Sequence, residues 1–222
     1  MRSDEEDYMR LLEQTIRKFL QPIDGVPFPL VVKALTGYRV LIFDSSIEEN
    51  KRLLERLAKA AQLGGQKAFE KGIISERANE AGNKIEDFIL DALKQVGLKA
   101  EKPVTRSGKR KNMGYPDIEI TDENNTILYL ECKTYSLAQK EQTFRTFYLS
   151  PSEDPKVTKD AFHLLMSFEI KRNERNGGRI FVPVTWQIYT LDKLLVQVKH
   201  EFNASNKDLY KAEALLAEGK IV

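Results

Sequence analysis

The chain has 222 residues, with 35 Lys and Arg against 33 Asp and Glu, which gives a net charge of +2. A single cysteine excludes a disulfide framework and predicts a reducing, cytoplasmic location, and two histidines leave little room for catalysis that needs several of them. No apolar run approaches the ~20 residues of a membrane span. The acidic first residues also lack the apolar stretch of a secretion signal, so we expect a globular protein with no membrane partner.

Residues 1–74 are predicted to form a mostly helical N-terminal extension, suited to a partner chain or to a recognition surface. Met9, Leu12, Ile16 and Phe19 follow one another at intervals of three or four residues, the spacing of an amphipathic helix. The elements expected here are a helix over 5–21, a short strand over 38–43, a long helix ended by Gly64-Gly65, and a helical segment over 66–72.

Residues 75–222 are predicted to form the second part of the chain, in which helical periodicity gives way to alternation after Gly97. The expected elements are a helix from about Asn83 to Val96, strands over 99–104, 115–121 and 126–133, a helix over 161–168, a strand over 179–189, and helices over 191–202 and 207–217. This order predicts an α/β protein with a mixed sheet flanked by helices.

Charged residues lie on one face of the predicted hairpin between residues 115 and 133. Alternate side chains of a strand share a face, so the Asp117 side chain points away from the face of Ile118. On the next strand, the Glu131 and Lys133 side chains point away from the face of Cys132. Pairing of the two strands can bring Asp117, Glu131 and Lys133 together, with an apolar sheet behind them. Cys132 is expected to be a buried small residue.

These residue types suit one kind of chemistry. Two carboxylates that converge on one spot favour a hard divalent cation such as Mg²⁺. An adjacent ammonium can orient a water molecule and offset negative charge on a phosphate. The set predicts metal-assisted hydrolysis of phosphodiesters.

The order Pro116-Asp117, thirteen intervening residues and Glu131-Cys132-Lys133 resembles the catalytic motif of the PD-(D/E)xK nuclease superfamily. The resemblance implies a restriction-endonuclease-like αβββαβ core with the motif on its second and third strands. It also implies that Asp117, Glu131 and the backbone carbonyl of Cys132 hold one or two Mg²⁺ ions per subunit. Lys133 would position the attacking water, and the products would carry 5′-phosphates.

A closer similarity is to type II restriction endonucleases that read interrupted palindromes, and it covers about residues 75–210. It rests on three stretches: Asn79 to Asn83, Thr105 to Gly108 with Gly114 to Asp117, and Leu149 to Ser152. The similarity implies a homodimer that binds double-stranded DNA and cuts one strand with each subunit, because a palindrome is read by a two-fold symmetric protein.

Glu86 has two interpretations. In the superfamily, a glutamate on the first core helix often supports the metal site, and Glu86 is the matching position. Asn83 and Glu86 also have the spacing of a capping box, in which the asparagine caps the helix and the glutamate bonds back to its amide.

A basic segment precedes the predicted site. Residues 99–115 carry a net charge of +5, so the rest of the chain sums to −3. The DNA-binding candidates there are Arg106, Ser107, Lys109, Arg110, Lys111 and Asn112. A localisation signal or a solvated loop is the alternative interpretation. A weaker basic cluster consists of Lys171, Arg172, Arg175 and Arg179.

Other functions stay open at this stage. The triplet Glu-x-Lys occurs often by chance, and exposed hairpins often alternate in charge. A structure-selective repair or recombination nuclease, like a junction resolvase, would carry the same motif and cut branched DNA. A non-catalytic DNA-binding module could keep the same fold. His163 is expected to be a packed helix residue, and Glu119 a solvated strand residue.

Overall fold

The computed structural model of the chain describes residues 2–21, 23–74, 78–111, 114–136, 147–175, 178–198, 205, 207 and 210–217. The chain divides into two compact units, one made of Met1–Val26 with Val196–Val222 and the other of Pro27–Leu195. Within the described residues, no helix is long and apolar enough to cross a membrane. The larger unit contains the whole predicted catalytic motif.

The smaller unit contains the first helix, α1 (Arg2–Phe19), which confirms the amphipathic helix predicted over 5–21. Strand β1 (Ile23–Pro27) pairs with β9 (Leu195–Val198), and a 3-10 turn, η1, spans Ala212–Ala214. The helix predicted over 191–202 is therefore wrong for the described residues, and of the helix predicted over 207–217 only Lys207 and the 3-10 turn are helical among the described residues. Alternating exposure along β9 and its two valines fit a strand better than a helix.

Three helices of the larger unit precede the predicted catalytic motif. Helix α2 (Phe28–Thr36) has proline in its first turn and ends at Gly37, whose φ of 86° is the left-handed C-cap conformation. Helix α3 (Glu48–Lys71) continues through Gly64 and Gly65, so the predicted stop there is wrong. A Cβ at Gly64 would lie 2.7 Å from Ile89 Cδ1 of helix α4 (Ala78–Gln95), so this glycine permits close helix packing.

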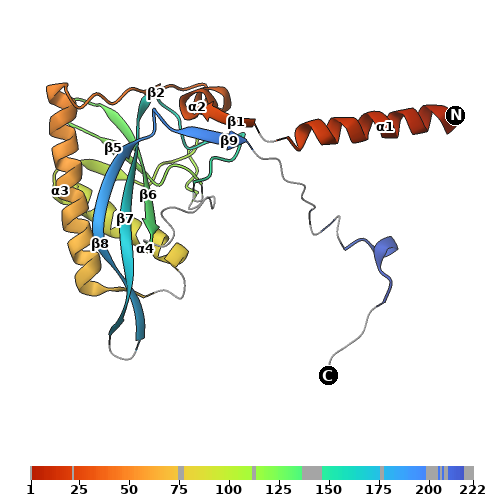
Figure 1. The fold of residues 1–222 in the computed structure, drawn as a ribbon. Helices are drawn as coiled ribbons and strands as arrows, with labels where there is room; N and C mark the ends of the chain where they lie inside the picture. The colour runs from red at the N-terminus through yellow and green to blue at the C-terminus, as the bar shows by residue number, and fades with distance from the viewer. Residues whose placement is uncertain are drawn as a thin grey trace. The chain divides into compact units, whose positions relative to one another are not determined.

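Among the described residues, the main sheet has seven strands, in the order β3-β8-β7-β6-β5-β4, with β2 paired to β7 (Figure 1). The strands are β2 (Val40–Leu41), β3 (Ile73–Ile74), β4 (Lys99–Glu101), β5 (Ile118–Thr121), β6 (Ile127–Tyr135), β7 (Ala161–Arg175) and β8 (Gly178–Thr190). Strands β5 and β6 are antiparallel, β6 and β7 parallel, and β7 and β8 antiparallel. The predicted α/β class with a mixed sheet flanked by helices is confirmed.

The helix predicted over 161–168 is wrong, because these residues begin strand β7. This strand lies between β6 and β8, where both of its faces are covered, so its apolar residues form a run without strict alternation. Such a run cannot be told from a buried helix by periodicity. The parallel pairing of β6 with β7 requires a crossover connection, and residues 137–146 of that connection lie outside the described part of the chain.

The main core lies between one face of the sheet and helices α3 and α4. It contains Leu57 of α3, Ile89 of α4 and alternate residues of β5, β6 and β7, such as Ile118, Leu130 and Met166. Because α3 packs against α4 and β8, it belongs to the same compact unit as the catalytic motif. The division of the chain predicted at residue 74 therefore does not coincide with the boundary at Val26 and Pro27.

Candidate active site

The hairpin of β5 and β6 brings the three motif residues together. Ile118 pairs with Leu130, and the Asp117 amide donates a hydrogen bond to the Leu130 carbonyl at 3.2 Å. The amide of Cys132 donates to Asp117 Oδ2 at 2.8 Å. Asp117 is therefore fixed to β6 beside Glu131 and Lys133 by two backbone contacts.

Glu131 and Lys133 form an ion pair on the face of β6 that points away from the main core. The Lys133 ammonium lies 2.6 Å from Glu131 Oε1, and the Glu131 side chain is only 5% exposed. The second oxygen of this carboxylate, Oε2, is buried and has no hydrogen-bond partner among the described residues. A buried carboxylate oxygen without a donor costs free energy, and a bound cation would remove that cost.

Burial raises the pKa of both carboxylates. Burial raises the pKa of Glu131 to about 7, and the charge of Asp117 adds to the rise. Burial likewise raises the pKa of Asp117, against the hydrogen bond from Cys132. For Lys133, burial acts to lower the pKa, but the charge and hydrogen bond of Glu131 outweigh it and raise the pKa. Two acids that both resist ionisation are typical of a site built for a cation.

Glu86 lies on α4 within electrostatic range of this pair. Burial, followed by the charge of Asp117, raises the pKa of Glu86 to about 7. The capping-box alternative fails, because α4 begins at Ala78 and Asn83 is already inside the helix. Even so, the described residues contain no group of three or more His, Cys, Asp or Glu side chains that could hold a metal ion.

A second lysine, which no sequence pattern had marked, supports the segment before Asp117. Lys156 is 6% exposed, and its ammonium donates to the carbonyls of Gly114 at 2.7 Å and Pro116 at 3.2 Å. Burial lowers the pKa of Lys156, while the charges of Asp117 and Glu131 act in the opposite direction. It stands in an irregular segment without periodicity, so no sequence pattern marks it.

An aromatic cluster lies next to the same segment. Tyr115 and His163 share a hydrogen bond of 2.5 Å between the phenol oxygen and Nδ1. Phe28 and Phe147 pack against the Tyr115 ring at centroid distances of 5.6 and 5.4 Å. Burial lowers the pKa of His163 to about 3, so the ring is neutral. His163 is packed as predicted, but on a strand rather than a helix.

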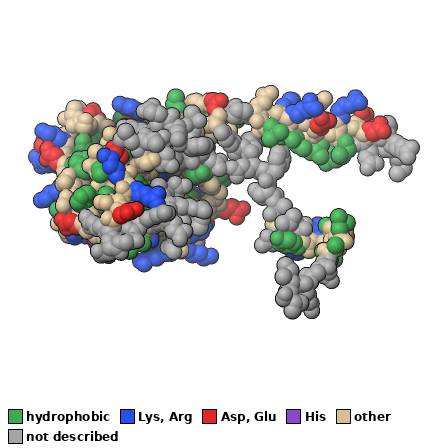
Figure 2. Space-filling view, turned by 60° about the horizontal axis from the view of Figure 1, so that its bottom comes forward, with side chains coloured by type: hydrophobic (Ala, Val, Ile, Leu, Met, Phe, Trp, Pro, Cys, Tyr) green, Lys and Arg blue, Asp and Glu red, His purple; other side chains and the backbone are tan. Residues whose placement is uncertain are grey.

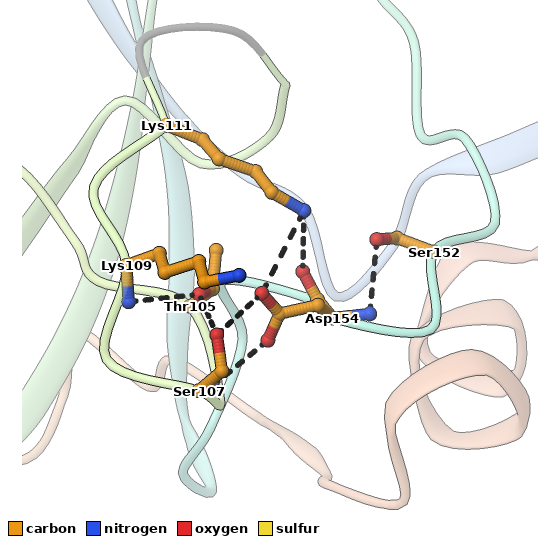
Figure 3. A network of polar contacts seen from close by, with 6 residues as sticks. All are labelled: Thr105, Ser107, Lys109, Lys111, Ser152 and Asp154. Carbon is orange, nitrogen blue, oxygen red and sulfur yellow. Dashed lines mark hydrogen bonds and ion pairs between the residues drawn. The ribbon is translucent and has the colours of Figure 1, made fainter.

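The predicted DNA-binding residues separate into two groups. Arg106 donates to the Thr36 carbonyl at 2.7 Å, and Ser107 and Lys111 both contact Asp154 (Figure 3). Lys109 and Arg110 are exposed, and Asn112 lies outside the described residues. The turn that carries them is closed by a hydrogen bond of 2.8 Å from the Thr105 amide to the Lys109 carbonyl.

Three further predictions concern residues near the site. Glu119 is buried rather than solvated, and its carboxylate pairs with Lys159 at 2.5 Å. Cys132 is 2% exposed in the main core, which confirms it as a buried residue. In the weaker basic cluster, Lys171 and Arg172 are exposed, whereas the side chains of Arg175 and Arg179 lie outside the description.

Fold and site together define a class of protein. The buried carboxylate of Glu131, the half-buried carboxylate of Asp117 and the Lys133 ammonium lie on one face of a mixed α/β sheet and form an acid–acid–lysine site, the arrangement that suits metal-assisted chemistry on phosphate esters. An exposed basic turn follows Thr105 and leads along the chain towards Asp117.

Comparison with known proteins identifies the family. The chain belongs to the type II restriction enzyme MjaV family, whose family model matches residues 23–213. The type II restriction enzyme MjaV of Methanocaldococcus jannaschii is 36% identical over 231 aligned residues, which cover 97% of this chain and 98% of that protein. No solved structure matches the chain.

Proposed function

We propose that the protein is a type II restriction endonuclease, a hydrolase that cuts double-stranded DNA at a specific sequence. The observation that carries the proposal is the buried acid–acid–lysine site, with its unpartnered Glu131 oxygen, in a chain of the MjaV family. An enzyme of this type acts where its DNA lies, and we infer a cytoplasmic location from the single buried cysteine.

The site has the composition of a Mg²⁺ site. Mg²⁺ is usually bound in proteins through one or two carboxylates together with waters and substrate phosphates, so Asp117, Glu131 and the Cys132 carbonyl suffice as protein ligands. Glu86 is a further candidate, since it shares the electrostatic field of the pair. One or two ions per subunit would supply a water of lowered pKa and neutralise charge on the phosphate.

The protein's own residues have distinct roles in the proposed reaction. Asp117 and Glu131 provide negative charge at a fixed separation, because Asp117 is bound to the β6 backbone. Lys133 donates hydrogen bonds to the attacking water and to the phosphate oxygens, and its charge stabilises the transition state. The water oxygen bonds to phosphorus, the bond to the 3′ oxygen breaks, and a 5′-phosphate and a 3′-hydroxyl result.

We also propose that the enzyme is a homodimer, since a palindromic site is read by a two-fold symmetric protein. Helix α1 supports this proposal. Its hydrophobic side chains gather on one side, away from the charged ones, and Met9 and Leu12 are 57% and 39% exposed (Figure 2). The sequence of α1 is acidic over residues 4–7 and basic in its last turn, so an antiparallel pairing of two copies would join opposite charges.

Digestion of a mixed-sequence plasmid with the purified protein tests the function. We expect discrete bands in Mg²⁺ and no cleavage in EDTA, and sequencing of the cut ends would give the site. Cleavage of branched DNA alone would indicate a structure-selective nuclease, and a gel shift without cleavage would indicate a binding module. Full Mg²⁺-dependent cleavage by Glu131→Ala would refute the assignment of the site.

Sedimentation tests the dimer separately. We expect the wild-type chain to sediment as a dimer and Leu12→Glu to shift it towards the monomer, because a charge would enter the apolar face of α1. Gln14→Glu is the matched control, since it adds the same charge at an exposed position of the same helix. A dimer unaffected by Leu12→Glu would place the interface elsewhere.

A further inference from the structure

Three consecutive residues, Asp154, Pro155 and Lys156, contact both ends of the segment that runs from the basic turn to Asp117. At the first end, the Asp154 carboxylate accepts hydrogen bonds from the amide and the hydroxyl of Ser107, each at 2.8 Å (Figure 3). The Pro155 carbonyl accepts a bond of 3.0 Å from the Arg106 amide. Residues 154–156, which we call the strap, thus hold the base of the basic turn.

Several hydrogen bonds hold the half-buried carboxylate of Asp154. The hydrogen bond from the Ser107 amide, together with those from the Thr105 and Ser107 side chains, lowers the pKa of Asp154 to about 2. The ammonium of Lys111 adds a contact of 3.2 Å to the Asp154 carbonyl and lies 3.8 Å from the carboxylate. Asp154 therefore carries its full negative charge at neutral pH and fixes both arms of the turn.

At the second end, Lys156 binds the backbone directly before Asp117. Its ammonium donates hydrogen bonds to the Gly114 and Pro116 carbonyls. These bonds hold the backbone that determines the direction of the Asp117 carboxylate. A cavity of about 300 Å³, lined by Lys111, Gly114 and residues of 148–157, lies beside the strap. The hydrogen bonds of Lys156 connect the strap directly to the backbone before Asp117.

We propose that the strap couples DNA contact at the basic turn to the position of the catalytic carboxylate, with Asp154 and Lys156 as positioning residues. The inference rests on the proposed nuclease function. Phosphates that meet Lys109 and Arg110 fix the register of the DNA without reading its sequence. The strap holds both the base of the turn and the backbone before Asp117. Docking of the DNA backbone on the turn is therefore coupled to alignment of the scissile phosphate at Asp117. A displacement of about 1 Å at a reacting group can lower the rate about 10²-fold.

The two residues predict different kinetic effects. Lys156→Met keeps the shape of the buried side chain but removes both anchors, so we expect cleavage at saturating DNA to slow about 10- to 100-fold while the DNA dissociation constant changes little. Lys156→Arg restores a donor and should recover part of the rate. Asp154→Asn releases the turn, so we expect weaker DNA binding and also slower cleavage at saturation.

Single-turnover cleavage in Mg²⁺ and DNA binding by fluorescence anisotropy in EDTA measure these effects, with cognate duplex as the probe. Lys159→Met is the matched control, because Lys159 follows the strap by three residues in the chain but pairs with Glu119 outside the site. The strap is refuted if Lys156→Met cleaves within about twofold of wild type, or if Asp154→Asn changes affinity alone. Should Lys156→Met fail to fold by circular dichroism, Asp154→Asn decides the question.

Lys133→Ala, assayed in parallel, separates this inference from the function on which it rests. If Lys133→Ala cleaves as wild type does, the proposed nuclease site is wrong. If Lys133→Ala is inactive and the strap variants are normal, the site stands and the coupling is refuted.

Discussion

The two faces of the β5–β6 hairpin carry different kinds of side chain. One face presents Ile118, Leu130 and Cys132 to the core under α3 and α4. The opposite face presents Asp117, Glu131 and Lys133, with charges held close together and partly out of water. One face therefore supplies stability through apolar burial, whereas the other holds two carboxylates whose charged forms are disfavoured by burial.

The largest expected effect is on the charged face. Glu131→Gln should lower cleavage at least about 10³-fold, because it removes a proposed metal ligand and the partner of Lys133. Its free energy of unfolding at pH 8 in EDTA should not fall, because the pKa of Glu131 is raised to about 7 and burial of the charged form is unfavourable.

Leu128→Val is the matched control for that measurement, since Leu128 lies on the same strand as Glu131 but faces the core. We expect it to lower stability slightly and to leave cleavage by the folded enzyme unchanged. A loss of activity equal to that of Glu131→Gln would show that the two faces are not separate in function.

The next effect concerns the apolar face. Ile89 of α4 is fully buried, so Ile89→Ala should lower the free energy of unfolding by about 2–5 kcal/mol through lost burial and the cavity left behind. Urea unfolding measures this change. Lys94→Ala on the exposed side of the same helix should stay within about 0.5 kcal/mol of wild type. A similar loss from both variants would count against the assigned core.

A smaller effect tests the close approach of α3 and α4. Helix propensity alone predicts that Gly64→Ala stabilises the protein by about 1 kcal/mol. A Cβ at Gly64, however, would lie 2.7 Å from Ile89 Cδ1 and 3.0 Å from the Phe88 carbonyl oxygen, so we expect a loss of about 1–3 kcal/mol. Gly65→Ala meets only the Phe168 ring, at 3.2 Å, and should lose less. Stabilisation by Gly64→Ala would contradict the observed packing.

The last effect is a pH dependence on the charged side of the sheet, spread over several pH units. The pKa of His163 is about 3 in the folded chain and about 6.5 when unfolded, so the unfolded state binds an extra proton between these values. Stability from this group is therefore present above about pH 6.5 and decreases by up to ~1.4 kcal/mol per unit as pH falls.

His163→Gln should flatten this acid limb relative to wild type in urea unfolding at pH 4 to 7. The difference between the two proteins isolates the histidine, because the carboxylates titrate in both. Tyr115→Phe removes the hydrogen-bond partner but keeps the buried ring, so it should retain the slope. Equal slopes in wild type and His163→Gln would show that the ring is already protonated or exposed.

Strands and helices differed in how far the sequence could predict them. The hairpin over 115–133 was predicted correctly, because alternation and a turn are local properties of the chain. The helix predicted over 161–168 was wrong, because a central strand covered on both faces loses its alternation. Gly64 and Gly65 suggested a helix end for an equally local reason, although their role is to admit Ile89 from a distant helix.

The candidate site shows the same division. Asp117, Glu131 and Lys133 were predicted together because they lie on two adjacent strands, where spacing alone sets the side-chain face. Lys156, Asp154 and the Tyr115–His163 pair could not be predicted, since their partners lie 40 or more residues away in sequence and no periodicity links them. The sequence also did not show that Arg106, although exposed like Lys109 and Arg110, donates a hydrogen bond to the Thr36 carbonyl.

By itself, the sequence determined the α/β class, the hairpin and which charged side chains share one face of it, because short-range spacing decides which side chains share a strand face. Only the tertiary structure decided how strongly Glu131 is buried, which basic residues contact other parts of the chain, and that residues 154–156 hold the segment before Asp117. The physical reason is that desolvation and long-range hydrogen bonds depend on what the fold brings near, and that information is spread over the whole chain.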